Sequence, residues 1–168
     1  MSRGSVGSAI LLVVVALLIL RPWEGGDEGP PRSEATVTRV VDGDTIEARI
    51  DGEVEDVRLI GIDTPESVQP GAPIECFGPQ ASDFTQRLLE GRTVRLVFGV
   101  ERRDHYGRLL AYVHLGDRFV NALIVRRGLA RTLTIPPNDR HAELLSRLET
   151  EAAEERPRPL GGVPALGG

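Results

Sequence analysis

The chain has 168 residues, enough for one domain of roughly 100–150 residues with short appendages. Hydrophobic residues make up 40% and charged residues 27%, which is typical of globular rather than disordered proteins. The formal net charge of −5 excludes a protein that holds nucleic acid by overall basicity, and 4% aromatic residues argue against a base-stacking platform. The single cysteine, Cys76, excludes an intramolecular disulfide and a cysteine-based zinc site.

The N-terminal segment has the layout of an export signal. Arg3 precedes an apolar run over residues 9–20, and Arg21 follows it. This run is short for a membrane span, which needs about 20 residues, and fits the core of a signal peptide. However, no small-x-small cleavage site follows. Residues 1–24 are therefore predicted to be a signal peptide or, if uncleaved, an N-terminal membrane anchor, and the sequence leaves the two open. In both cases we expect an exported protein, secreted or held at the cell envelope.

Composition also sets the expected limits of the folded domain. Residues 25–33 are a polar Gly/Pro stretch, which predicts a flexible linker. Residues 156–168 are again rich in Pro and Gly and are predicted to form a flexible C-terminal tail. The folded domain is therefore expected to span residues 34–155.

Within these limits the pattern is first rich in strands and then mixed. β-Branched runs between turn residues predict strands, and Asp51-Gly52 is a strong two-residue hairpin signal. Helices are predicted where apolar residues recur at helical spacing and Pro or Gly marks an end. The predicted strands are 35–41, 45–50, 54–62, 93–98 and 109–114, and the predicted helices are 79–90, 120–127 and 139–155. These elements predict an α+β domain, a five-stranded OB-fold β-barrel with about three helices packed on it.

Three polar clusters are candidates for chemistry. They are residues 42–45 (DGDT), residues 58–66 (RLIGIDTPE) and residues 104–108 (DHYGR). Each alone has an ordinary structural explanation. The first is a turn with acidic residues, the second is a strand end followed by a helix cap with Glu66 in a capping box, and the third is a turn with a solvated arginine.

Together, the clusters favour a phosphodiesterase site. A strand hairpin would bring Asp44 and Asp63 within reach of each other, and two carboxylates with carbonyl and water oxygens suit Ca²⁺ rather than zinc. Glu66 is close enough in sequence to activate a water, and Arg58 and Arg108 can bind phosphate. One obstacle is the five-residue separation of Arg58 and Asp63. Odd spacing on a regular strand points the two side chains to opposite faces, so a bulge or a barrel bend is required.

In this order, the clusters closely resemble the staphylococcal nuclease (thermonuclease) family over about Thr36 to Glu155. The motifs that carry the resemblance are VVDGDTIEARIDGE, VRLIGIDTPE, FGPQASDFTQRLLEGRTVRLVF, DHYGRLLAYV and FVNALIVRRGLA. The resemblance implies an OB-fold barrel with three helices, Ca²⁺ dependence and hydrolysis of both DNA and RNA. It also implies products with 3′-phosphate ends.

The resemblance assigns roles to individual positions. The calcium carboxylates of the family fall on Asp44 and Asp63, and the backbone carbonyl of Thr64 falls on a further metal ligand. The two catalytic arginines that bind phosphate fall on Arg58 and Arg108. The barrel of the family brings these positions together, which would remove the obstacle of odd spacing.

Further positions carry over with departures. The glutamate usually assigned as general base falls on Glu66, and the tyrosine that hydrogen-bonds the terminal phosphate of a bound nucleotide falls on Tyr106. His105 stands where the family's type member has lysine. Thr134 stands where a second nucleotide-facing tyrosine is expected, so weaker base stacking is expected there. Cys76 has no evident His partner and is expected to be a structural thiol.

Two classes of function follow from these observations. The first is a Ca²⁺-dependent, sugar-non-specific nuclease, expected to act as a monomer on DNA and RNA with no protein partner. Membrane contact is expected only through the N-terminal segment, if it stays uncleaved. The alternative is a non-catalytic OB-fold module that binds nucleic acid or a protein, because a fold alone does not fix a function. The complete catalytic set and the acidic net charge argue against this alternative.

Overall fold

The structure, a computed structural model, describes residues 31–65 and 78–155 of the chain. The predicted signal or anchor segment, most of the predicted linker, the predicted tail, Glu66 and Cys76 lie outside these residues. The described strands and helices are β1 (Arg32–Val40), β2 (Thr45–Ile50), β3 (Glu53–Leu59), β4 (Gly61–Asp63), α2 (Gly78–Leu89), β5 (Thr93–Arg103), β6 (Leu109–Leu115), β7 (Arg118–Phe119), α3 (Val120–Arg126), β8 (Arg131–Leu133) and α4 (Ala142–Glu155).

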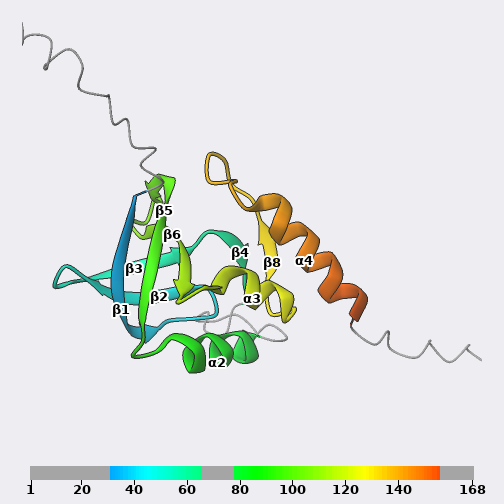
Figure 1. Ribbon diagram of the computed structural model, residues 1–168, viewed down its shortest axis with the longest axis horizontal. Coiled ribbons are helices and arrows are strands. Elements are labelled where there is room, and N and C mark those ends of the chain that lie inside the picture. The colour runs from blue at the N-terminus through cyan, green and yellow to red at the C-terminus, as the bar shows by residue number, and fades with distance from the viewer. Residues whose placement is uncertain (1–30, 66–77, 156–168) are drawn as a thin grey trace, which may run out of the picture.

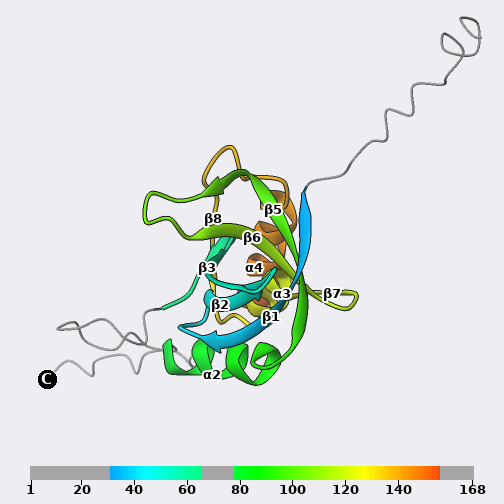
Figure 2. The ribbon, with the colours of Figure 1, turned by 90° about the vertical axis from the view of Figure 1, so that its left-hand side faces the viewer.

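Five strands form the closed barrel that the sequence predicts. β3, β2, β1, β5 and β6 are hydrogen-bonded in that order, and a further pairing between β3 and β6 closes the ring. That pairing is parallel, whereas the other neighbours in the ring are antiparallel. Figures 1 and 2 show α2 below the strands, and Figure 1 shows α3 and α4 beside them. The α+β class, the OB-fold barrel and its three packed helices are therefore confirmed in the described part of the chain.

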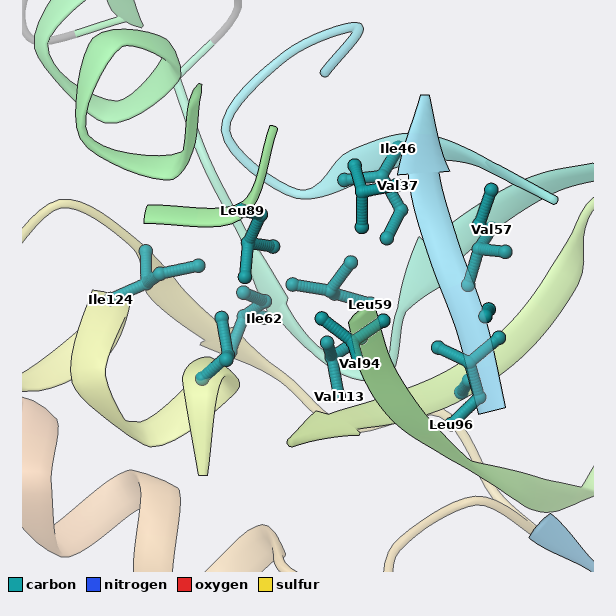
Figure 3. Close-up of a cluster of buried hydrophobic side chains, with 14 of the residues drawn as sticks. Val37, Ile46, Val57, Leu59, Ile62, Leu89, Val94, Leu96, Val113 and Ile124 are labelled. Atoms are coloured by element: carbon teal, nitrogen blue, oxygen red, sulfur yellow. The ribbon is translucent and has the colours of Figure 1, made fainter. Parts of the chain in front are cut away.

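The core fills the barrel and extends under the helices. Alternate residues of β1, such as Ala35 and Val37, are buried, because successive side chains of a strand point to opposite faces. Figure 3 shows how side chains from strands and helices meet there, with Leu89 of α2 and Ile124 of α3 close to Ile62. The labelled core residues in this view are Val37, Ile46, Val57, Leu59, Ile62, Leu89, Val94, Leu96, Val113 and Ile124.

The predicted hairpin is confirmed. β2 and β3 are antiparallel from Thr45 opposite Arg58 to Ile50 opposite Glu53, and the turn residues Asp51 and Gly52 have φ of 50° and 94°. Two consecutive positive φ angles are those of the type I′ turn that favours Asp-Gly. The register of this hairpin places Arg58 beside the loop that carries Asp44.

Several element boundaries differ from the sequence prediction. The predicted strand 54–62 is two strands, β3 and β4, because the chain bends at Gly61, which has a φ of 81°. β5 runs on to Arg103 past an irregular register after Phe98. The short strands β7 and β8 were not predicted, and α4 begins at Ala142 rather than at residue 139.

The N-terminal strand also begins earlier than expected. β1 starts at Arg32, two residues before the predicted start of the domain, because Arg32 and Ser33 pair with Val97 and Leu96 of β5. The last residues of the predicted linker are thus part of the barrel sheet. Within residues 31–65 and 78–155, the structure contains no helix that is both long and apolar enough to cross a membrane.

Candidate active site

The first candidate cluster is the loop between β1 and β2, which is held from several sides. The Asp42 carboxylate accepts a hydrogen bond from the Asp44 backbone N–H at 3.0 Å, an arrangement that stabilises tight turns. From α2, the Thr85 hydroxyl donates to the Gly43 carbonyl at 2.8 Å. A Cβ atom on Gly43 would lie 2.8 Å from both Ala81 and Thr64, so only glycine allows this close approach. The loop therefore holds Asp44 in one place against the helix.

Asp44 is a buried carboxylate, with 4% of its surface exposed. Its Oδ2 accepts hydrogen bonds from the Thr64 backbone N–H at 2.7 Å and from the Thr64 hydroxyl at 3.0 Å. Its Oδ1 forms an ion pair with Arg58 Nη1 at 2.9 Å. Burial raises the pKa of Asp44 to about 7, although the charge of Arg58 and the bonds from Thr64 act in the opposite direction. The site therefore holds a carboxylate whose charge Arg58 and Thr64 compensate only in part.

The bend at Gly61 brings Arg58 and Asp63 together. Arg58 Nη2 lies 3.0 Å from Asp63 Oδ1, and Nη1 donates to the Ile62 carbonyl at 2.9 Å. Gly61 suits this bend because its φ is positive, and a Cβ atom added there would lie 2.7 Å from Leu145 Cδ1, so the end of that side chain would have to shift. The bend thus supplies the departure from a regular strand that the five-residue spacing requires.

The third candidate cluster is the turn between β5 and β6. Asp104 Oδ1 accepts the backbone N–H groups of Tyr106 and Arg108, both at 3.0 Å, and its Oδ2 accepts Arg108 Nε at 2.8 Å. Partial burial raises the pKa of Asp104, but the hydrogen bonds and the charge of Arg108 outweigh it, and the net pKa is lowered. Gly107, with a φ of 86°, closes the turn. Arg108 is therefore positioned by its own turn.

Arg58 and Arg108 line the same cavity, of about 330 Å³. His105 contributes to this lining from the turn, and Leu133 and Ile135 add an apolar side. Leu133 and Ile135 are largely exposed for aliphatic residues, at 41% and 60%. A cavity with two guanidinium groups and an apolar side suits a ligand that carries both a phosphate and a nucleobase.

The neighbours Tyr106 and His105 face different hollows of the surface. Tyr106 is 74% exposed and is not part of the lining of this cavity. It lines a separate depression together with Glu47 and Glu55, and Arg108 borders this depression too. The rings of His105 and Tyr106 are in contact, with centroids 3.7 Å apart. His105, where the type member of the family has lysine, is thus the neighbour that lines the Arg58 cavity. Thr134 is exposed between Leu133 and Ile135.

The chemistry of the donor set fits a hard cation. Asp44 and Asp63 both contact Arg58, and Thr64 adjoins them, so the available donors are oxygens. In the part of the chain that the structure describes, no group of three or more His, Cys, Asp or Glu side chains gathers in one place. From the described residues, a cation here would meet two carboxylates together with carbonyl and water oxygens. Such ligands suit Ca²⁺ better than zinc.

Other residues of the site were missed by sequence reasoning. Buried Asn121 accepts from the Val113 N–H at 2.9 Å and donates to the Ile60 carbonyl at 2.8 Å, which fixes the chain just before the bend. The Asn138 side chain accepts a hydrogen bond from the Glu101 backbone N–H at 3.1 Å and donates one to the Glu101 carbonyl at 2.9 Å. The asparagines gave no signal in the sequence. Gly61 inside a strand pattern did, because isolated glycines in strands mark bends and bulges.

The barrel and this cleft define the class of the protein first: an OB-fold domain with a cleft in which two arginines lie close to aspartates. The family model described as "Staphylococcal nuclease homologue" matches residues 56–158, more than half of the chain. The chain therefore belongs to the family of staphylococcal nuclease homologues. It is an enzyme of the nuclease class, as the relatives below also indicate.

Relatives extend the match over nearly the whole chain. The thermonuclease of Staphylococcus intermedius is 40% identical over 164 residues, which cover 93% of this chain and 96% of that protein. The thermonuclease of Staphylococcus hyicus is 38% identical, over 88% of this chain and 92% of that protein. The SPbeta prophage-derived endonuclease YokF of Bacillus subtilis is 37% identical, over 73% of this chain and 42% of that protein.

Proposed function

We propose that the protein is a Ca²⁺-dependent, sugar-non-specific nuclease that hydrolyses phosphodiester bonds of DNA and RNA and leaves 3′-phosphate ends. The observation that carries the proposal is that Arg58 pairs with two aspartates. Its guanidinium contacts both Asp44 and Asp63 at the edge of a cavity that Arg108 also lines. The specificity for both sugars and the nature of the ends rest on the resemblance to the nuclease family.

In this proposal the two arginines act on the phosphate. Arg58 and Arg108 border one cavity from β3 and from the β5–β6 turn, so a phosphate between them meets guanidinium groups on two sides. Planar guanidinium groups bind phosphate oxygens in pairs and stabilise the charge that develops on a pentacoordinate phosphorus. We therefore assign both arginines to catalysis.

The cation site of the proposal consists of Asp44, Asp63 and the backbone carbonyl of Thr64. When bound, Ca²⁺ supplies positive charge that polarises the phosphate and makes a nearby water more acidic. The partly compensated charge of buried Asp44 supports this assignment, because a buried carboxylate is stabilised by a cation. The contact of Arg58 with both carboxylates supports a shared site for them.

Glu66 is proposed as the general base and Tyr106 as a group that binds a terminal phosphate. Both assignments rest on the resemblance. Glu66 lies outside the described residues, two positions after Thr64, whose backbone is bonded to Asp44. Tyr106 adjoins Arg108, whose guanidinium carbon is 5.3 Å from the centre of the tyrosine ring. A phosphate bound by Tyr106 would therefore lie on the outer side of Arg108.

The N-terminal segment supports a proposal on location. A charged start followed by an apolar run fits an exported protein, secreted or anchored at the cell envelope. We further propose a monomer that meets only its nucleic-acid substrate, with membrane contact through residues 1–24 if they are retained.

The test of the proposed function uses the full chain. Degradation of single-stranded DNA and of RNA is followed with Ca²⁺ and with excess chelator, for wild type, Glu66→Ser and the control Glu53→Ser. Glu53 lies exposed at the far hairpin, so its loss should change little. We expect Ca²⁺-dependent cleavage of both substrates that only Glu66→Ser loses, and end-labelling that reveals 3′-phosphates. Cleavage in chelator, or full activity of Glu66→Ser, would contradict the proposal.

A further inference from the structure

The two-stranded sheet β4–β8 presents one face to the active site. Gly61 is opposite Leu133, and Asp63 is opposite Arg131, in antiparallel register. Residues two apart on a strand share a face, so these four residues lie on the same side of the sheet. Asp63 on this side pairs with Arg58. Gly61, Ile62 and Leu133 all line the cavity that Arg58 borders. Arg131 therefore lies on the side of the sheet where Asp63 meets Arg58.

The opposite face of this sheet is occupied. Ile62 is buried in the core. The Glu149 carboxylate of α4 accepts hydrogen bonds from the Thr132 backbone N–H, at 3.2 Å, and from the Thr132 hydroxyl. Figure 1 shows β8 between β4 and α4. Thr132 and Ile62 thus fix the orientation of β8, and Arg131 has to project on the side of Asp63.

Arg131 differs from the two other arginines of the site. Arg58 is shared by Asp44 and Asp63, and Arg108 is bound to Asp104. Arg131 is exposed, and its guanidinium makes no ion pair or hydrogen bond with any residue of the described ranges. Directly opposite residues have Cβ atoms about 4.5–5.5 Å apart. Asp63 nevertheless bonds Arg58, which leaves the charge of Arg131 available to a ligand.

We propose that Arg131 is a substrate-binding residue: it binds a backbone phosphate that flanks the scissile one. This inference rests on the proposed function and extends its site along β8. An exposed guanidinium next to Asp63 can hold a neighbouring phosphate while the scissile phosphate lies between Arg58 and Arg108. A chain of net charge −5 is not expected to attract a polyanion strongly at long range, which gives local arginine contacts more weight.

The test compares Arg131→Gln with Arg118→Gln in the full chain. Both variants remove one exposed arginine charge, and Arg118 lies on β7, on a different sheet. For Arg131→Gln, we expect KM for a long single-stranded DNA to rise about 3- to 10-fold with kcat within about twofold, as for loss of one exposed charge contact. A dinucleotide, which lacks a flanking phosphate, should be cleaved as by wild type. Arg131→Lys should recover part of the loss.

A binding measurement separates this inference from the proposed nuclease activity. Affinity for a labelled single-stranded oligonucleotide is measured in chelator over a range of salt. We expect weaker binding by Arg131→Gln, with a salt slope shallower by about 0.7. If wild type binds but does not cleave and this difference remains, the proposed activity fails, whereas the contact of Arg131 with a backbone phosphate stands. If wild type cleaves while Arg131→Gln binds and cleaves as Arg118→Gln does, the inference fails alone. Equal losses on the dinucleotide and the long strand would also overturn it.

Discussion

The proposed active site contains two aspartate–arginine pairs that the fold positions in different ways. Arg58 and Asp44 meet from β3 and from the β1–β2 loop, with 15% and 6% of their side chains exposed. Arg108 and Asp104 are four residues apart on one turn, and 29% and 15% of their side chains are exposed. Burial raises the pKa of Asp44 to about 7, whereas the hydrogen bonds within its turn lower the pKa of Asp104 despite partial burial.

This difference shows that one chemical pair can have two structural roles. The Arg58 pair is part of the tertiary structure, because it links the loop, β3 and the bend before Asp63. The Arg108 pair is a local feature, because Asp104 also accepts two backbone N–H groups of its own turn. Both arginines face one cavity, so we expect similar importance for catalysis and different importance for stability.

Arg58→Ala should have the largest effect. We expect kcat/KM to fall by about 10²–10³-fold, as for loss of one group that stabilises developing charge. We also expect the free energy of unfolding to fall by about 3 kcal/mol, because the buried Asp44 carboxylate loses the Arg58 guanidinium. Nuclease assays and urea unfolding measure the two effects. Arg58→Lys keeps the charge but cannot span both carboxylates, so it should remain well below wild type. A stable Arg58→Ala variant would contradict the tertiary role of the pair.

Arg108→Ala should lower the rate about as much as Arg58→Ala does, but it should leave stability nearly unchanged. We expect about 10²-fold lower kcat/KM and a change of unfolding free energy within about 1 kcal/mol, because Asp104 keeps its backbone hydrogen bonds. The same two assays decide the outcome. If Arg108→Ala unfolds as readily as Arg58→Ala, the two pairs do not differ as the structure indicates.

Gly61→Ala tests the bend that brings Arg58 to Asp63. We expect a loss of about 1–2 kcal/mol for the positive φ alone, a further loss from contact with Leu145, and reduced activity. Gly116→Ala is the matched control, since Gly116 also has a positive φ but has no atom within 4 Å of an added Cβ. The control should lose stability only from its backbone and keep full activity. Equal stability losses in both variants would contradict the role of the contact.

The pH dependence of stability should separate the two aspartates. In chelator, native Asp44 keeps its proton up to about pH 7, whereas unfolded Asp44 loses it near pH 3.8. The native state therefore binds more protons in this window, and the contribution of Asp44 to stability falls as the pH rises from about 4 to 7. Asp44→Asn should remove this slope in urea unfolding.

The lowered pKa of Asp104 acts in the opposite sense. Its contribution to stability is present above pH 3.8 and is lost as the pH falls through the lower pKa of the native state. Asp104→Asn should therefore leave the slope between pH 4 and 7 unchanged. An unchanged slope in Asp44→Asn would show that another group causes it.

The sequence by itself determined the local parts of this protein. Asp51-Gly52 specified the hairpin because its two positive φ angles suit few other residues. The order of the three polar clusters identified the family, and the strand and helix patterns predicted the five-stranded barrel. The turn that holds Arg108 was visible as a unit, because its aspartate, glycine and arginine lie within five residues.

Only the tertiary structure decided how the segments meet. The short strands β4 and β8 are each three residues long, too short for an alternating pattern to be recognised, and they are stabilised by pairing with each other. The bend at Gly61 lies against Leu145, about 80 residues away in the chain. Such contacts are set by packing between distant segments, and local patterns do not encode them. The position of Arg131 beside Asp63 follows from that packing.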